Sequence, residues 1–209
     1  MVLLVASLAA ACNAEPGSAG ASNVSDGATM SDAVATRPTP TRISASTGGA
    51  LTLSGPADKA ARAAVVAEAG RQGMIDVDVA PSQSFVVTEG RQKVATLLTG
   101  RGTMPGAVNA GCFVAVRQAD DTALIPTLGY GNYEAETCGG PLAVGLLASG
   151  TTVRIGLIFR SYSQDAAETT PMVIEWDRST NTLLIDEASS NRAFDSGATS
   201  IAAMRRLVR

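Results

Sequence analysis

The sequence predicts an α+β domain built mainly on an antiparallel β-sheet, with one early helix and one C-terminal helix, preceded by a signal peptide and a disordered tether. Three observations predict this class. Apolar residues make up 45% of the 209 residues, which is enough for one core. Alternation with a period of two recurs over residues 74–186. The gaps between these runs are too short for parallel crossovers, so we expect antiparallel pairing in a sheet that could close into a barrel.

The chain opens on an apolar run, residues 2–11, that has the length expected of a secretory signal. A helix of about 12 residues spans only about 18 Å, which is short of a hydrocarbon core of about 30 Å. The run ends in LAAAC, residues 8–12, which resembles a bacterial lipobox. The resemblance implies that Cys12 carries a lipid anchor, and that Asn13 after it directs the protein to the outer membrane.

The match departs from the lipobox pattern at two points. Ala9 stands where leucine is usual, and no lysine or arginine precedes the apolar run. The true start could therefore lie upstream of Met1. Ordinary cleavage after Ala11 would instead leave Cys12 free in a secreted protein, and a third alternative is a chain that is not exported.

Residues 13–49 differ sharply in composition from residues 50–209. Serine, glycine, alanine, threonine and proline dominate, and no apolar period survives. Such a stretch buries too little surface to offset its ordering entropy, so we expect a disordered tether. The predicted organisation is a leader at 1–12, the tether at 13–49 and one β-rich domain at 50–209.

The domain should open with a short strand at 51–53 and a helix at 57–72. Pro56 and Asp58 suit the start of that helix and Arg71 suits its end, because of the helix dipole. Its expected packing face is Ala61, Ala64, Val65 and Ala67.

Nine further strands are expected, and Pro126 predicts that its strand lies at an edge or carries a bulge. A C-terminal helix should follow, capped by Asp195 or Ser196, with an apolar stripe of Ile201, Met204 and Val208. This order of elements resembles lipocalin-like barrels, at the level of the fold alone. The nine candidates are residues 74–79, 84–88, 93–98, 112–117, 123–128, 142–148, 152–159, 172–176 and 182–186.

Two further cysteines, Cys112 and Cys138, predict a disulfide if the chain is exported. The bridge would close a loop of about 27 residues and stabilise the fold by about 3.5 kcal/mol on the chain-entropy model. In a cytosolic chain they would be buried thiols. The bridge would pin the segment 129–133, where exposed Tyr130 and Tyr133 could form a contact surface or could pack over a hairpin end.

Acidic pairs with i, i+2 spacing occur three times: Asp76/Asp78, Glu134/Glu136 and Glu175/Asp177. On a strand this spacing puts both carboxylates on one face, where they could carry out acid–base chemistry or bind calcium. The same alternation is typical of any half-exposed strand.

Composition argues against several functions. The chain has no histidine, which removes the usual imidazole-based nucleophile systems and His-ligated zinc. Lys59 and Lys93 are the only lysines and the arginines are scattered, so a nucleic-acid partner is not expected. We expect no catalytic residue, no cofactor and no metal site.

The prediction is therefore a non-enzymatic binding or scaffolding module of the cell envelope, held in the periplasm by a lipid at Cys12. Its partners would be the membrane, through that anchor, and an envelope protein or a small ligand. Two alternatives stay open: a carboxylate-based or calcium-dependent envelope hydrolase, and a secreted inhibitor or immunity-type protein.

Overall fold

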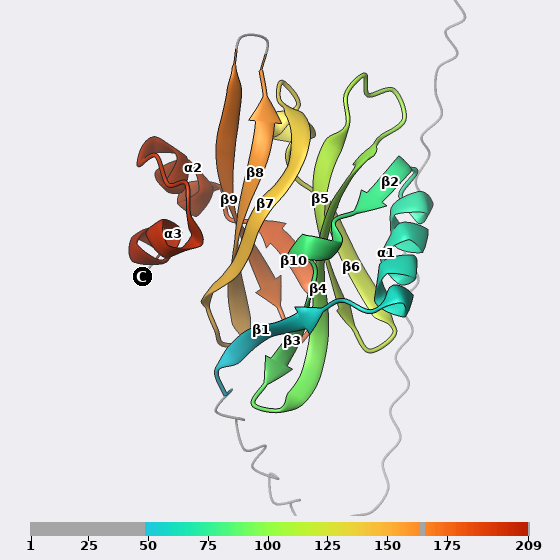
Figure 1. Ribbon diagram of the computed structural model, residues 1–209, viewed down its shortest axis with the longest axis vertical. Coiled ribbons are helices and arrows are strands. Elements are labelled where there is room, and N and C mark those ends of the chain that lie inside the picture. Colours follow the sequence, from blue (N-terminus) through green and yellow to red (C-terminus); the bar gives the residue numbers. More distant parts are fainter. Residues whose placement is uncertain (1–48, 164–165, 209) are drawn as a thin grey trace, which may run out of the picture. The chain divides into compact units, whose positions relative to one another are not determined.

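The computed structural model of the protein describes residues 49–163 and 166–208 (Figure 1). Cys12, the predicted leader and the predicted tether up to residue 48 lie outside the described residues. In chain order the elements are β1 (Leu51–Pro56), α1 (Lys59–Arg71), β2 (Ile75–Val79), η1 (Pro81–Gln83), β3 (Phe85–Glu89), β4 (Gln92–Thr103), β5 (Gly111–Gln118), β6 (Asp121–Pro126), η2 (Gly131–Tyr133), β7 (Thr137–Ala148), β8 (Thr152–Tyr162), β9 (Ala167–Asp177), β10 (Thr182–Ile185), α2 (Glu187–Asp195) and α3 (Ile201–Leu207).

Every predicted strand is present and the strands pair antiparallel. Strand β4 is longer than predicted, because it continues past Leu98 through Gly100 and Gly102, where glycine interrupts the apolar pattern. Glycine is needed at Gly100, since a Cβ atom there would collide with the backbone oxygen of Asp78 and the ring of Phe113.

The strands form two separate sheets. The six-stranded sheet has the order β1-β3-β4-β5-β6, with β2 also pairing with β4, and the four-stranded sheet has the order β10-β9-β8-β7. Neither sheet closes on itself, so the barrel expectation is wrong. The physical reason is local pairing, because among the described residues the strands before residue 127 pair only with one another, and so do the strands after it. Strand β6 lies at an edge, which confirms the prediction from Pro126.

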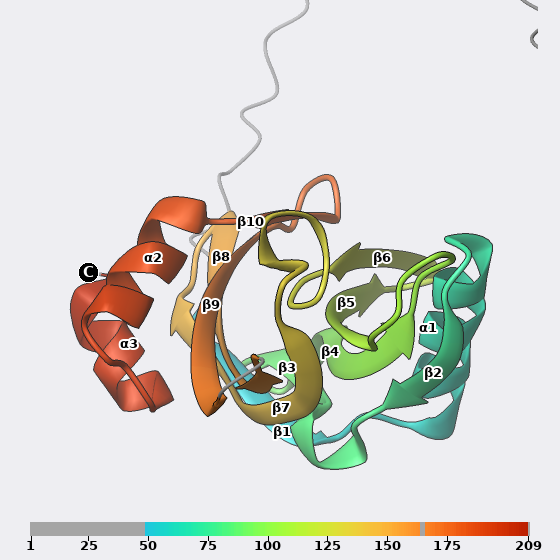
Figure 2. The same ribbon diagram turned by 90° about the horizontal axis from the view of Figure 1, so that it is seen from above.

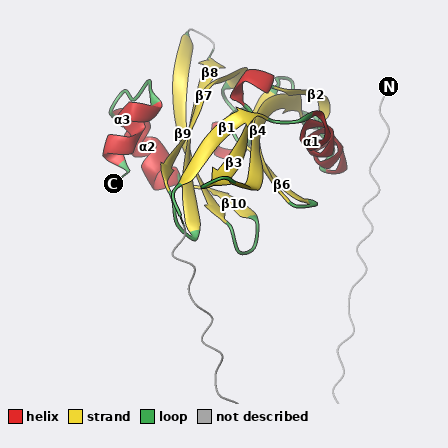
Figure 3. Ribbon diagram, turned by 60° about the horizontal axis from the view of Figure 1, so that its bottom comes forward, coloured by secondary structure: helices red, strands yellow, loops and turns green. Residues whose placement is uncertain are grey.

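The two sheets pack face to face over one apolar interior, and helices cover their outer faces (Figures 2 and 3). Strand β5 contributes buried side chains to the apolar clusters on both faces of its sheet. Its residues Cys112, Val114 and Val116 face the interior between the sheets, whereas Phe113 and Ala115 belong to the cluster under α1. A strand covered on both faces has a continuous apolar run, as the sequence CFVAV shows. The described domain is thus a four-layer sandwich.

Helix α1 confirms the prediction of a helix at 57–72. Asp58 is its N-cap and accepts a hydrogen bond of 2.7 Å from the backbone N–H of Ala61. The buried residues are Ala61, Val65 and Ala69, which a spacing of four places in one stripe. Ala67, predicted on the packing face, is exposed because it lies two positions away from that stripe.

The predicted C-terminal helix is present as α3, but its predicted cap is wrong, and a second short helix, α2, precedes it. Asp186 caps α2 and Ser200 caps α3. Asp195 is the last residue of α2 rather than the cap of a helix. The helical path does not continue through Gly197, whose φ of +66° favours glycine. The predicted apolar stripe of α3 is confirmed, since Met204 and Val208 are buried and Ile201 is half-buried, against the outer face of the four-stranded sheet.

A disulfide joins the two sheets at one end. Cys112 on β5 and Cys138 on β7 are bonded, with Cα atoms 5.3 Å apart, which confirms the predicted bridge. The backbone N–H of Cys138 also donates to the carbonyl of Ala110 at 2.9 Å. Both sulfur-bearing side chains are buried, so the bridge is part of the interior.

Polar contacts join the sheets at the opposite end. The buried Trp176 indole N–H donates to the Asn181 side-chain oxygen at 3.1 Å, and the Asn181 amide donates to the Asp121 carboxylate at 2.8 Å. Arg178 also forms an ion pair with Glu89 at 2.9 Å. The sandwich is therefore fastened at both ends of its strands.

We predict that the Cys112→Ala/Cys138→Ala double variant loses about 3.5 kcal/mol of unfolding free energy in equilibrium urea denaturation, because its unfolded state regains loop entropy. Cys12→Ala is the matched control and should unfold like the wild type. Equal losses in both variants would contradict the assigned pairing.

Candidate functional site

The predicted contact loop lies between β6 and β7, beside the disulfide. Tyr130 and Tyr133 are both half-buried rather than exposed. The Tyr130 hydroxyl donates to the carbonyl of Gly102 at 2.8 Å. The Tyr133 hydroxyl donates to the Glu187 carboxylate at 2.5 Å. Both hydroxyls are thus used within the domain, and a contact role for this loop stays a prediction.

Burial raises the pKa of the Tyr133 hydroxyl above its ordinary value, and the hydrogen bond to the Glu187 carboxylate raises it further. Burial likewise raises the pKa of Tyr130. Nearby, the Glu136 carboxylate accepts a hydrogen bond of 2.8 Å from Thr170 on β9. Bonds to β4, α2 and β9 therefore hold residues 130–136 in one position.

The three acidic pairs lie on separate parts of the fold. The pair Asp76/Asp78 does not share a regular strand face, because Asp76 has a φ of 53° and a register shift falls between residues 75 and 78. Glu134 and Glu136 precede β7 and are not on a strand. Glu175, on β9, forms an ion pair of 3.2 Å with Arg154. Asp177 accepts hydrogen bonds from the hydroxyl and the backbone N–H of Ser179, and they lower the pKa of its carboxyl group.

The described residues contain no group of three or more Cys, Asp or Glu side chains placed to hold a metal ion. Within the same ranges, no helix has both the length and the apolar character that crossing a bilayer requires.

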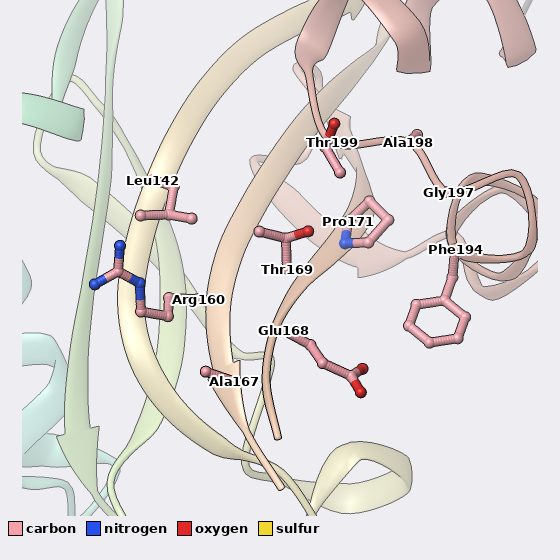
Figure 4. Close-up of a pocket in the computed structure, with 10 residues that line it drawn as sticks. All are labelled: Leu142, Arg160, Ala167, Glu168, Thr169, Pro171, Phe194, Gly197, Ala198 and Thr199. Carbon is pink, nitrogen blue, oxygen red and sulfur yellow. The ribbon is translucent and has the colours of Figure 1, made fainter. Parts of the chain in front are cut away.

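A hollow of about 490 Å³ lies on the outer face of the four-stranded sheet, beside the connection from α2 to α3 (Figure 4). Phe194 and Leu142 line it with exposed fractions of 50% and 40%, which are high for side chains of this size. Pro171 and Ala198 are buried and form its floor. The full lining is Leu142, Arg160, Ala167, Glu168, Thr169, Pro171, Phe194, Gly197, Ala198 and Thr199.

Two side chains of opposite charge stand in this hollow on neighbouring strands. Arg160 comes from β8 and Glu168 from β9, and both are exposed. Figure 4 shows the Arg160 guanidinium on the side of Leu142 and the Glu168 carboxylate on the side of Phe194. The ion pairs found among the described residues include neither of them. Aromatic and arginine side chains around an apolar floor are typical of a protein contact surface.

Sequence reasoning did not find this hollow. Phe194 is the second-to-last residue of α2 (EASSNRAFD), in which it is the only large apolar side chain, and this isolated Phe is the one signal that could have drawn attention. Arg160 and Glu168 are distant from Phe194 in sequence, and only the register of β8 and β9 together with the turn after α2 brings them together.

No family model matches the chain, and no curated protein and no solved structure is significantly similar to it.

The raised Tyr133 pKa predicts how stability depends on pH. The native state holds this proton more tightly than the unfolded chain, where the pKa is near 10.0. The resulting stabilisation is complete below that pH and is lost as the pH rises above it. Urea midpoints of the wild type should therefore fall more steeply than those of Tyr133→Phe between about pH 9 and pH 11.

Glu187→Gln is the matched variant for this test. It keeps a hydrogen-bond acceptor but removes the carboxylate charge. Its plot of urea midpoint against pH should therefore lie between those of the wild type and Tyr133→Phe. Parallel curves for the wild type and Tyr133→Phe would contradict the assigned hydrogen bond.

Proposed function

We propose that this chain is an exported, non-enzymatic binding or scaffolding module, anchored to the cell envelope through Cys12, that contacts a protein partner at the hollow around Phe194. The observation that carries the proposal is the buried disulfide between Cys112 and Cys138. Disulfides of this kind form and persist in oxidising compartments, and they are rare in the cytosol. The lipobox-like residues 8–12 supply the route of export and the anchor.

The hollow supports the binding part of the proposal. Exposed Phe194 and Leu142 supply apolar area, and Arg160 and Glu168 supply charges of both signs at its rim. The buried floor, which includes Pro171, belongs to a packed sheet, so little ordering entropy has to be lost on binding. An open surface of this kind suits a protein partner better than a small ligand, which is normally enclosed on most sides.

The anchor is tested by labelling the full chain with radioactive palmitate in its host. We predict that cleavage of the labelled precursor is sensitive to globomycin, and that labelling is lost in Cys12→Ala and persists in Cys112→Ala/Cys138→Ala. Unlabelled mature protein in the medium would support the secreted alternative. Reduced, full-length protein in the cytosolic fraction would overturn the proposal.

The contact surface is tested by placing a photo-crosslinking phenylalanine analogue at position 194 in the otherwise unchanged chain. We predict one discrete adduct in intact cells, and its loss when Arg160→Glu is added. Leu184 is the matched control position, because it is 63% exposed and does not line the hollow. The same adducts from both positions, or an adduct that survives Arg160→Glu, would contradict this surface.

A further inference from the structure

The two sheets have two pairs of neighbouring edge strands, β6 with β10 and β1 with β7. At the first pair, the amide of Asn181, in the turn just before β10, donates to the Asp121 carboxylate of β6 at 2.8 Å. The second pair is β1 and β7, for which the described part of the chain provides one pairing strand each, β3 and β8, respectively. Among the described residues, no backbone hydrogen bond joins β1 to β7, although the two strands are in contact.

A groove of about 610 Å³ is lined by residues of both edge strands. Leu51 and Leu53 of β1 line one side, and Val144 and Leu146 of β7 line the other. An edge strand presents a row of backbone N–H and C=O groups that another chain can pair with, which proteins usually cover or interrupt. Strand β7 is interrupted by three register shifts, whereas β1 has one, after Ser54. The regular part of β1, residues 51–54, is therefore a better edge than β7 for pairing with a strand of another chain.

One charged side chain lines this groove, and it is positive. Arg205 of α3 reaches into it and donates from Nε to the carbonyl of Leu146 at 2.9 Å. No carboxylate lines the groove, and the ion pairs of the described residues include none to Arg205. Among the described residues, the groove thus combines apolar side chains from both strands, an edge of β1 with no pairing partner and a single cation.

We infer that this groove binds an extended peptide segment of a partner protein, which adds as a strand to the free edge of β1 and directs a carboxylate to Arg205. Main-chain hydrogen bonds to residues 51–54 hold the peptide, and alternate apolar side chains of the peptide contact Leu53 and Val144. Because this surface is distinct from the hollow around Phe194, a module with both can bring two partners together. The inference does not depend on export or on the anchor.

The experiment uses the full chain and the fluorescently labelled hexapeptide Thr-Val-Thr-Val-Thr-Val with a free C-terminal carboxylate. Fluorescence anisotropy should show saturable binding, and the C-terminally amidated peptide should bind about 2- to 5-fold more weakly, as expected for one exposed ion pair. Arg205→Gln should remove the difference between the two peptides, and Arg205→Lys should restore part of it. Phe194→Gln is the matched surface control and should bind both peptides like the wild type.

Two further measurements test the mode of binding. Two versions of the peptide are methylated at the backbone nitrogens of its odd or its even residues, which removes main-chain donors without altering the protein. Because only one of these sets of N–H groups would face β1, one of the two N-methylated peptides should lose binding. Hydrogen exchange at residues 51–54 should slow when the unmodified peptide is added. Absence of saturable binding, or equal binding by the parent peptide and both N-methylated peptides, would overturn the inference. Concentration-dependent dimerisation that slows exchange at the same residues without peptide would overturn it too, because it would assign the groove to a second copy of the chain.

Discussion

The fold depends on the apolar interior that the two sheets share, because each sheet is built from one half of the domain. The chain crosses from one sheet to the other only once among the described residues, between β6 and β7. The bridge from Cys112 to Cys138 spans that crossing, so the two halves are joined covalently where they also meet through the backbone. Trp176 and Asn181 close the interior at the other end of the strands. Without this shared interior, each sheet would expose one apolar face.

Much of the secondary structure could be predicted, because strand alternation and helix capping are local. The strands and α1 follow from period and cap residues, and the disulfide follows from two cysteines in a chain with a leader-like start. The division into two sheets could not be predicted, since pairing is decided by packing. Helix α2 was missed for a different reason: its buried positions are Ser189, Ser190 and Ala193, which make no apolar stripe. Ser190 is buried because its hydroxyl accepts the backbone N–H of Val173 at 2.9 Å.

The candidate site was less predictable than the fold. A tyrosine near a glycine suggests an exposed contact, yet Tyr130 and Tyr133 donate their hydroxyl protons to groups inside the domain. The surface around Phe194 depends on where the helices end, because α2 and α3 leave the part of the sheet near Arg160 uncovered. The local sequence does not indicate which part of a sheet a distant helix covers.

The first residue of β1 and the hollow around Phe194 lie at different ends of the sandwich. Leu51, the first residue of β1, pairs with Glu89, at the end of the sandwich where Arg178 joins the sheets. The hollow is lined by Arg160 and Glu168, which lie next to the hairpin between β8 and β9 at the disulfide end. The chain therefore enters the domain at one end of the strands and presents the hollow at the other.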